Sequence, residues 1–239
     1  MVLFASDLHL CESRPQINQI FFEFLRGPAR AAESLYILGD LFEYWAGDDD
    51  LGDPFNASVV SRLAECSRAG VAVNIMHGNR DFLLGDAFAE ACEAHLVPDP
   101  CSIELGGTST LLLHGDTLCT DDADYQRFRA EVRAQDWKRR FLSLPLARRK
   151  QQIAGMRERS ESEKKRKIPA IMDVNREAVE QVLRDHGYPR LIHGHTHRPA
   201  HHEFLLDGRR CERWVLADWY RSGSFLRCDQ RGCAPAELG

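Results

Sequence analysis

The chain has 239 residues, which suits one domain with an insertion better than two domains. It is 44% hydrophobic and 28% charged, with 10 prolines and 17 glycines, and this composition excludes a disordered or fibrous protein. The net charge is −5, but the stretch from Arg127 to Lys167 carries 15 basic and 5 acidic residues. With no run of 18 apolar residues and no leader-like start, we expect a cytosolic protein with eight reduced cysteines.

Strands and helices alternate in the first 120 residues. Short apolar runs at residues 2–6, 34–38 and 71–76 stop at polar or glycine residues, as buried strands do. Apolar residues at helical spacing predict helices in the stretch INQIFFEFL, near residues 57–68 and near residues 87–94. TSTLLLHG predicts a further strand. This βαβαβ rhythm predicts a layered α/β fold.

The segment of residues 121–169 breaks this rhythm. It has no strand pattern, and apolar residues such as Tyr125, Phe128 and Trp137 recur at helical spacing among many basic ones. We predict a helical insertion with one apolar and one basic face. The core domain would then consist of residues 1–120 and 170–239.

The remainder of the chain predicts mainly strands. A helix is expected at residues 174–185, followed by a strand at RLIHG. HHEFLL, RCERWVLA and SGSFLRC predict antiparallel strands, with Asp207-Gly208 as a hairpin turn. The predicted fold class is therefore α/β, with two packed mixed sheets flanked by helices and a helical lid inserted between the two parts of the core.

Metal-binding side chains follow the predicted strands. Residues i and i+2 of an extended segment point to the same side, so Asp7 and His9 can approach one ion together. Open α/β sheets place their sites at these carboxyl ends. Each element alone could be an ordinary turn, but their succession predicts one site. The strand ends read Asp7-Leu8-His9, Gly39-Asp40, Gly78-Asn79-Arg80-Asp81, His114-Gly115-Asp116 and Gly194-His195-Thr196-His197.

In this order, the motifs resemble those of the calcineurin-like metallophosphoesterase family: DxH, GDxxD, GNHD, H and GHxH. Two positions depart from the family pattern, because Glu43 replaces the usual Asp and Arg80 replaces the usual His. GDLFEYWAGDD with GNRD is similar to the branch that hydrolyses UDP-2,3-diacylglucosamine in lipid A biosynthesis. The resemblance implies a two-sheet metallophosphoesterase fold and a dinuclear metal site.

The resemblance also implies roles for individual residues. Two metal ions would activate water for attack at the α-phosphorus, giving UMP and 2,3-diacylglucosamine 1-phosphate. Oxygen and imidazole ligands favour Mn²⁺ over Zn²⁺, and leave iron and cobalt open. One ion would be bound by Asp7, His9 and His197 and the other by Asn79, His114 and His195, with Asp40 bridging. The residues implied in catalysis are Asp40, Asn79, Arg80 and His114.

The substrate contacts implied by the resemblance lie partly in the insertion: Asn79, Arg80, Asp122, Ser160, Lys164, Lys167 and His195. Four of these positions have simpler alternatives: Asp122 could merely cap a helix, and the pattern of Ser160, Lys164 and Lys167 could be a charged surface. An apolar lid suits acyl chains, and its basic face suits an anionic membrane surface. We therefore expect an enzyme located peripherally on the cytoplasmic face of the inner membrane.

Three other functions remain open at this point. A soluble-nucleotide pyrophosphatase or general phosphodiesterase of the same fold would not need an apolar lid. A basic nucleic-acid or membrane-binding module with a vestigial metal site is the alternative outside enzymes, although the complete ligand set speaks against it. We expect no nucleic-acid partner and infer no obligate protein partner.

Overall fold

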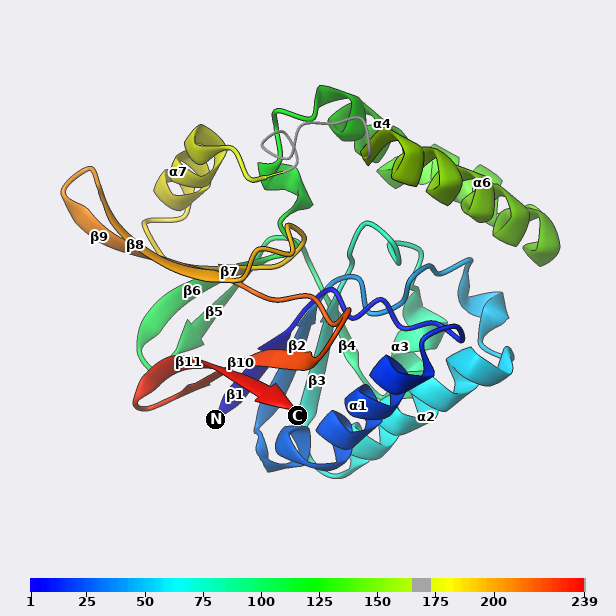
Figure 1. Cartoon of the computed structure of the whole chain (residues 1–239), viewed down its shortest axis with the longest axis horizontal. Helices are drawn as coiled ribbons and strands as arrows, with labels where there is room; N and C mark the ends of the chain where they lie inside the picture. Colours follow the sequence, from blue (N-terminus) through cyan, green and yellow to red (C-terminus); the bar gives the residue numbers. More distant parts are fainter. Residues whose placement is uncertain (165–172, 239) are drawn as a thin grey trace.

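The computed structural model describes residues 1–164 and 173–238, and the side chains of residues 161–164 are not part of this description. Two β-sheets pack face to face with helices on their outer faces (Figure 1). The strand order is β11-β10-β1-β2-β3-β4 in the first sheet and β5-β6-β7-β9-β8 in the second. The fold is therefore the predicted pair of mixed sheets.

The first sheet is built from alternating strands and helices, with β1 to β4 in parallel. Two antiparallel strands from the end of the chain extend it beside β1. Its elements are β1 (Val2–Ala5), α1 (Pro15–Arg26), η1 (Pro28–Ala31), β2 (Ser34–Leu38), η2 (Asp48–Asp50), α2 (Pro54–Arg68), β3 (Ala72–Met76), α3 (Asp86–Cys92), β4 (His95–Val97), β10 (Gly223–Asp229) and β11 (Gly232–Leu238).

In the second sheet, β7 lies parallel to both β6 and β9, and the two edges are antiparallel hairpins. Helix α7 covers its outer face (Figure 1). The elements are β5 (Cys101–Leu105), β6 (Thr108–Leu113), η3 (Asp116–Leu118), α7 (Arg176–Asp185), β7 (Arg190–His193), β8 (Ala200–Leu206) and β9 (Arg209–Val215).

Alternating side chains divide the core into layers. In β1, Leu3 and Ala5 pack towards α1 and α2, whereas Phe4 packs between the two sheets. In β6, Leu111 and Leu113 pack under α7, whereas Leu112 faces the other sheet. Both faces of these strands are buried, and this explains why they read as continuous apolar runs in the sequence.

The predicted insertion contains helices α4 (Ala123–Arg133), α5 (Gln135–Leu142) and α6 (Leu146–Lys164). They form a layer above the loops that leave the strands, at the opposite end from both termini (Figure 1). Phe141 belongs to the same apolar core as the first sheet, and Trp137 stacks on it with ring centroids 4.6 Å apart. The apolar side of the insertion is thus packed against the core.

Among the described residues, none of the helices has the length and apolar character to cross a bilayer.

Several details differ from the sequence-based expectations. Strands β4, β5 and β11 were not predicted, because β4 has only three residues and β5 and β11 alternate with exposed positions at or near sheet edges. Pro235 lies in β11, where an edge strand tolerates a missing N–H. The helix expected near residue 57 begins at Pro54, because Asp53 accepts hydrogen bonds from the first-turn N–H groups. Strand β9 pairs antiparallel with β8 but parallel with β7.

The expectation of eight reduced cysteines is wrong for one pair. Cys228 and Cys233 form a disulfide. They are directly opposite each other in the β10–β11 hairpin, with Cα atoms 4.1 Å apart. The register of the two strands places the cysteines opposite each other. Their spacing in the sequence does not by itself predict this pairing. The other six cysteines are free thiols.

Candidate active site

The site begins with unusual backbone conformations at the strand ends. Asp7, His9, Asp40, His195 and His197 all have positive φ, between 50° and 70°. Non-glycine residues rarely adopt this conformation. Each residue that does so raises the free energy of the folded state by about 1–3 kcal/mol. Five predicted metal ligands thus share a strained conformation that the surrounding structure must hold in place. Such strain concentrates at functional sites.

Asp81 joins two of the loops that carry these residues. Its buried carboxylate accepts hydrogen bonds from the backbone N–H groups of Gly78 and Leu41 at 2.8 Å, and of Asp40 and Phe42 at 3.3 Å. Burial and the neighbouring Asp40 carboxylate raise the pKa of Asp81 to about 6. The Asp81 carboxylate therefore ties the loop after β2 to the loop after β3.

The first cluster of polar side chains contains Asp7, His9 and His197. His197 Nε2 lies 3.2 Å from Asp7 Oδ1 and 3.4 Å from His9 Nε2. His9 Nε2 also lies 3.7 Å from Asp40 Oδ2. Although burial opposes ionisation, the hydrogen bond from His197 and the charges of nearby histidines hold the pKa of Asp7 well below its usual range.

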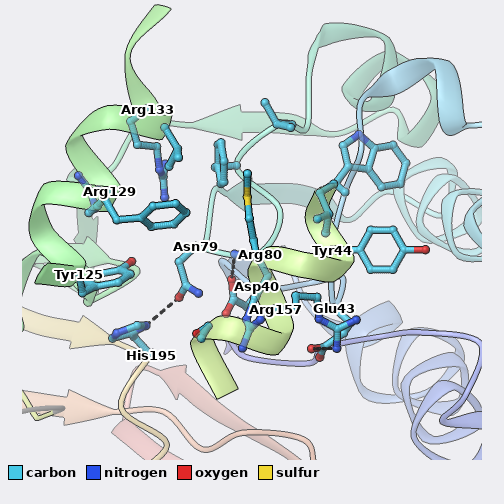
Figure 2. Close-up of a pocket in the computed structure, with 18 of the residues that line it drawn as sticks. Asp40, Glu43, Tyr44, Asn79, Arg80, Tyr125, Arg129, Arg133, Arg157 and His195 are labelled. Carbon is cyan, nitrogen blue, oxygen red and sulfur yellow. Dashed lines mark hydrogen bonds and ion pairs between the residues drawn. The ribbon is translucent and has the colours of Figure 1, made fainter. Parts of the chain in front are cut away.

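The second cluster contains Asn79, His114 and His195. Asn79 Oδ1 lies 3.0 Å from His114 Nε2. The same oxygen lies 2.9 Å from His195 Nδ1 (Figure 2). Asp40 Oδ1 lies 3.9 Å from His114 Nε2, whereas its other oxygen faces His9. One buried carboxylate therefore presents an oxygen to each cluster. The structure brings all seven predicted ligands to one place.

The orientation of the histidines fits a divalent cation. Nδ1 of His114 hydrogen-bonds Leu38 O at 2.8 Å, and this contact leaves Nε2 facing the cluster. His9 and His197 have the same arrangement, with Nδ1 next to Glu43 at 3.3 Å and next to Asp218 at 3.5 Å. Metal-bound histidines characteristically direct their second nitrogen to a carbonyl or carboxylate.

The electrostatics also favour a cation. Burial lowers the pKa of His114, but the carboxylates of Asp40, Asp7 and Asp116 outweigh it and raise the pKa to about 9. Ligand-type atoms of Asp7, His9 and His197 lie within 4.8 Å of one another, as do those of Asp7, Asp40 and His114. The donors are oxygen and imidazole nitrogen, which suit divalent metal ions.

Both clusters open into a cavity of about 590 Å³ between the core and the insertion. Arg80 lines it, and the Arg80 backbone N–H donates to Asp40 Oδ1 at 2.8 Å (Figure 2). The insertion contributes both apolar and charged residues to the wall of this cavity. The apolar and aromatic lining residues include Phe82, Phe128, Trp137, Phe141, Ile153 and Met156.

The structure describes only some of the predicted substrate contacts. Asp122 and Ser160 both line the cavity, and Asp122 also caps α4 by accepting a hydrogen bond from the Tyr125 N–H at 3.1 Å. The side chain of Lys164 and all of Lys167 lie outside the described residues. The capping alternative for Asp122 therefore coexists with its place in the cavity wall.

Helix α4 is attached to the site through Asp116. This buried carboxylate accepts hydrogen bonds from Arg129 Nε at 2.7 Å and from the Tyr125 hydroxyl at 2.8 Å. Arg133 donates to Gly78 O at 2.8 Å, and the Tyr125 ring stacks on His195 at 6.0 Å. Tyr125, Arg129 and Arg133 line one side of the cavity (Figure 2).

Sequence reasoning did not anticipate several neighbours of the ligands. The roles of Glu43, Asp116 and Arg157 depend on contacts between segments distant in the chain, so local patterns do not reveal them. Asp218 and Tyr220 lie in the loop after β9, which ends at Val215, and this position after a strand is the signal that could have identified them. The Tyr220 ring stacks on His9 with centroids 5.2 Å apart.

Comparison with known proteins agrees with these motifs. Curated proteins named "UDP-2,3-diacylglucosamine hydrolase" include one from Aromatoleum aromaticum, 56% identical over 96% of this chain and 94% of that protein. Another, from Cellvibrio japonicus, is 47% identical over 97% and 96%, and one from Aeromonas hydrophila is 49% identical over 95% and 93%. The family model for calcineurin-like phosphoesterases matches residues 1–199. The chain belongs to the calcineurin-like phosphoesterase family.

Proposed function

We propose that this protein hydrolyses the diphosphate of UDP-2,3-diacylglucosamine, giving UMP and 2,3-diacylglucosamine 1-phosphate, in lipid A biosynthesis. The observation that carries the proposal is the union of the two ligand clusters and an apolar chamber in one cavity. A substrate with a diphosphate next to acyl chains matches both parts. Relatives 46–56% identical carry the corresponding name.

The residues proposed to hold two Mn²⁺ ions are the six of the two clusters together with Asp40, which lies between them. When bound, such ions supply charge stabilisation to phosphoryl oxygens and make water a better nucleophile. The chain's own part is to orient these ligands. Asp81 fixes the Asp40 loop, and the Leu38 carbonyl fixes the His114 ring.

Arg80 and the leaving group explain why the usual histidine is dispensable in this proposal. A phosphate monoester has a second pKa near about 6, so it departs without receiving a proton from the protein. The Arg80 guanidinium provides charge and hydrogen bonds to the diphosphate without acting as an acid. Asn79 and His195, next to Arg80 in the cavity wall, are proposed to contact the same phosphates.

The insertion is proposed to serve as the lipid-binding side of the cavity. Burial of acyl chains against Phe82, Trp137 and Ile153 contributes roughly 0.8 kcal/mol per CH₂ group. Asp122 and Ser160 lie in the wall of the same cavity and are proposed to bind the sugar. Lys164 and Lys167 remain proposed contacts on the basis of the sequence motif alone.

We also propose that the insertion contacts the anionic cytoplasmic face of the inner membrane. Arg139, Arg140 and Arg148 are exposed on α5 and α6, and Leu142 is 41% exposed beside them. Exposed basic and apolar side chains together favour attachment to an anionic bilayer surface.

The function is tested by hydrolysis assays on purified, metal-stripped protein, with and without added Mn²⁺. We expect release of UMP from UDP-2,3-diacylglucosamine only when the metal is added. A deacylated UDP-sugar and a duplex oligonucleotide serve as parallel substrates. Equal cleavage of the deacylated sugar would favour a soluble-nucleotide pyrophosphatase, and cleavage of the oligonucleotide would favour a phosphodiesterase.

Trp137→Ala tests whether the wall of the cavity binds the acyl chains of the substrate. Removal of the indole from the chamber wall is expected to reduce kcat/KM for the acylated substrate by roughly 10-fold or more, since large-to-small changes of this kind cost at least about 1.4 kcal/mol. Cleavage of a small chromogenic phosphodiester, which does not reach the chamber, should change little. An equal loss on both substrates would contradict the lipid-binding role of this wall.

A further inference from the structure

Glu43 lies between the first ligand cluster and the insertion. Glu43 is 4% exposed and lies in the loop that follows β2. Oε2 lies 3.3 Å from His9 Nδ1, and Oε1 accepts a hydrogen bond of 2.6 Å from the guanidinium of Arg157 on α6. Figure 2 shows the carboxylate meeting Arg157 at the floor of the cavity. The two oxygens thus serve two different parts of the molecule.

Towards the core, Glu43 constrains the ring of His9. With Nδ1 next to the carboxylate, Nε2 points to Asp40 at 3.7 Å and to His197 at 3.4 Å. The Tyr220 ring stacks on His9, with an angle of 16° between the two ring planes. A carboxylate in this position fixes both the tautomer and the direction of a ligating histidine.

Towards the insertion, Glu43 holds a residue 114 positions away in the sequence. The Arg157 side chain is 38% exposed, and a pair between two exposed ions would contribute little. Here the acidic partner is buried and already held by His9, so little additional ordering is needed to form the pair. Near the start of α6, Arg149 forms a separate ion pair with Asp49, away from the ligand clusters.

Arg14 completes the surroundings of the carboxylate. Its guanidinium lies 3.8 Å from Glu43 Oε2 and 4.3 Å from the centre of the Tyr220 ring. The negative charge of Glu43 is therefore balanced from both the core and the insertion. Neutralising it would leave two guanidinium groups near His9 without their acidic partner.

We infer that Glu43 is a positioning residue that couples the metal site to the insertion, by orienting His9 with one oxygen and holding α6 through Arg157 with the other. This inference rests on the proposed metal-dependent function. Coupling between two sites is reciprocal. Metal binding at His9 therefore stabilises the docked position of α6, and docking of α6 strengthens metal binding.

Metal affinity tests the first half of the inference. In isothermal titration of metal-stripped protein with Mn²⁺, Glu43→Gln should raise the dissociation constant by about 10- to 100-fold, the usual effect of losing such a partner. Arg157→Ala should raise it by a smaller factor, about 5-fold. Glu104→Gln removes an exposed carboxylate on β5 and should leave the affinity unchanged.

Hydrogen exchange tests the second half. In the unaltered protein, Mn²⁺ should slow amide exchange in peptides covering residues 146–160 of α6. Arg157→Ala and Glu43→Gln should abolish this effect, and Arg157→Lys should restore part of it because the charge remains. Asp49→Asn removes a different acidic partner of α6, so exchange should be faster overall while the effect of Mn²⁺ persists.

These measurements need no substrate, so the two proposals fail differently. If the unaltered protein binds Mn²⁺ but does not cleave UDP-2,3-diacylglucosamine, the proposed substrate is wrong and the coupling still holds. If Glu43→Gln binds Mn²⁺ as tightly as the unaltered protein, or α6 exchange ignores the metal, the coupling is overturned. Absence of any Mn²⁺ binding by the unaltered protein would overturn both.

Discussion

Asp40 illustrates how single residues build this site. Its carboxylate has one oxygen near His9 and the other near His114, its backbone φ is 53°, and it is 1% exposed. A buried carboxylate beside histidines of both clusters is well placed to neutralise two cations. Few substitutions are compatible with all of these constraints.

Asp40→Asn tests the importance of this charge. The amide oxygen still accepts the hydrogen bond from the Arg80 N–H, so the loop should keep its conformation. Turnover of UDP-2,3-diacylglucosamine at saturating Mn²⁺ should fall roughly 1,000-fold, which corresponds to about 4 kcal/mol of lost transition-state stabilisation. Asp86→Asn, at an exposed position at the start of α3, is the control. Near-normal turnover of Asp40→Asn would remove Asp40 from the metal site.

Gly78 has a steric role at the same place. A Cβ atom added there would overlap Asp40 at both Oδ1 and the backbone N. Gly78→Ala should therefore lower the free energy of unfolding by about 1–3 kcal/mol and weaken Mn²⁺ binding. Urea denaturation and titration calorimetry measure the two effects. Gly52→Ala, where nothing lies within 4 Å of the added Cβ, should be close to neutral, and equal losses in both variants would contradict the steric argument.

At the scale of elements, the insertion is joined to the core by polar contacts as well as by packing. Arg129 on α4 pairs with Asp116 after β6, Arg133 reaches Gly78 O, and Lys138 donates to Phe82 O at 3.3 Å. These acceptors all come from loops that follow strands. The insertion is therefore held against the same loops that carry the proposed metal ligands.

Arg129→Met tests the anchor of α4. The change leaves the Asp116 carboxylate, which is fully buried, without its closest cationic partner. Loss of one partner of such a pair costs about 3 kcal/mol, which urea denaturation would detect. Arg127→Met on the same helix changes a residue whose side chain is 73% exposed, and should cost less than about 0.5 kcal/mol. Similar small effects in both variants would show that packing alone holds α4.

For the whole molecule, charge is segregated although the net value is −5. The basic residues concentrate in the insertion, while the proposed metal ligands beneath it include the buried carboxylates Asp7 and Asp40. This arrangement places a positive outer surface above a negative centre. The negative centre suits a cation, and the basic exterior is the basis of the proposed contact with an anionic membrane surface.

Binding to vesicles tests the outer surface. The protein should sediment with vesicles containing anionic lipid, and less so as the salt concentration rises. Replacing Arg139 and Arg140 by alanine should weaken binding by roughly 25-fold, at about 1 kcal/mol for each basic residue. Arg176→Ala changes one exposed arginine on α7 and is the control. If all variants bind equally, the membrane contact lies elsewhere.

The sequence by itself determined the alternation of strands and helices, the two-sheet fold class and the group of residues that meet at the strand ends. These features depend on local periodicity and on the rule that parallel strands end on one side of a sheet. Even the helical nature of the insertion was readable from the spacing of its apolar residues, as far as residue 164.

Only the tertiary structure decided which side chains pair with one another, both between distant segments and within the β10–β11 hairpin. The contacts of Glu43 with Arg157, of Asp116 with Arg129 and the disulfide between Cys228 and Cys233 depend on packing and register. Such pairings depend on how the whole chain packs and on which charges become neighbours. A sequence with the same local pattern could fold with these residues far apart. The grouping of the proposed ligands was therefore predictable one strand at a time, whereas their contacts with residues joined to the insertion were not.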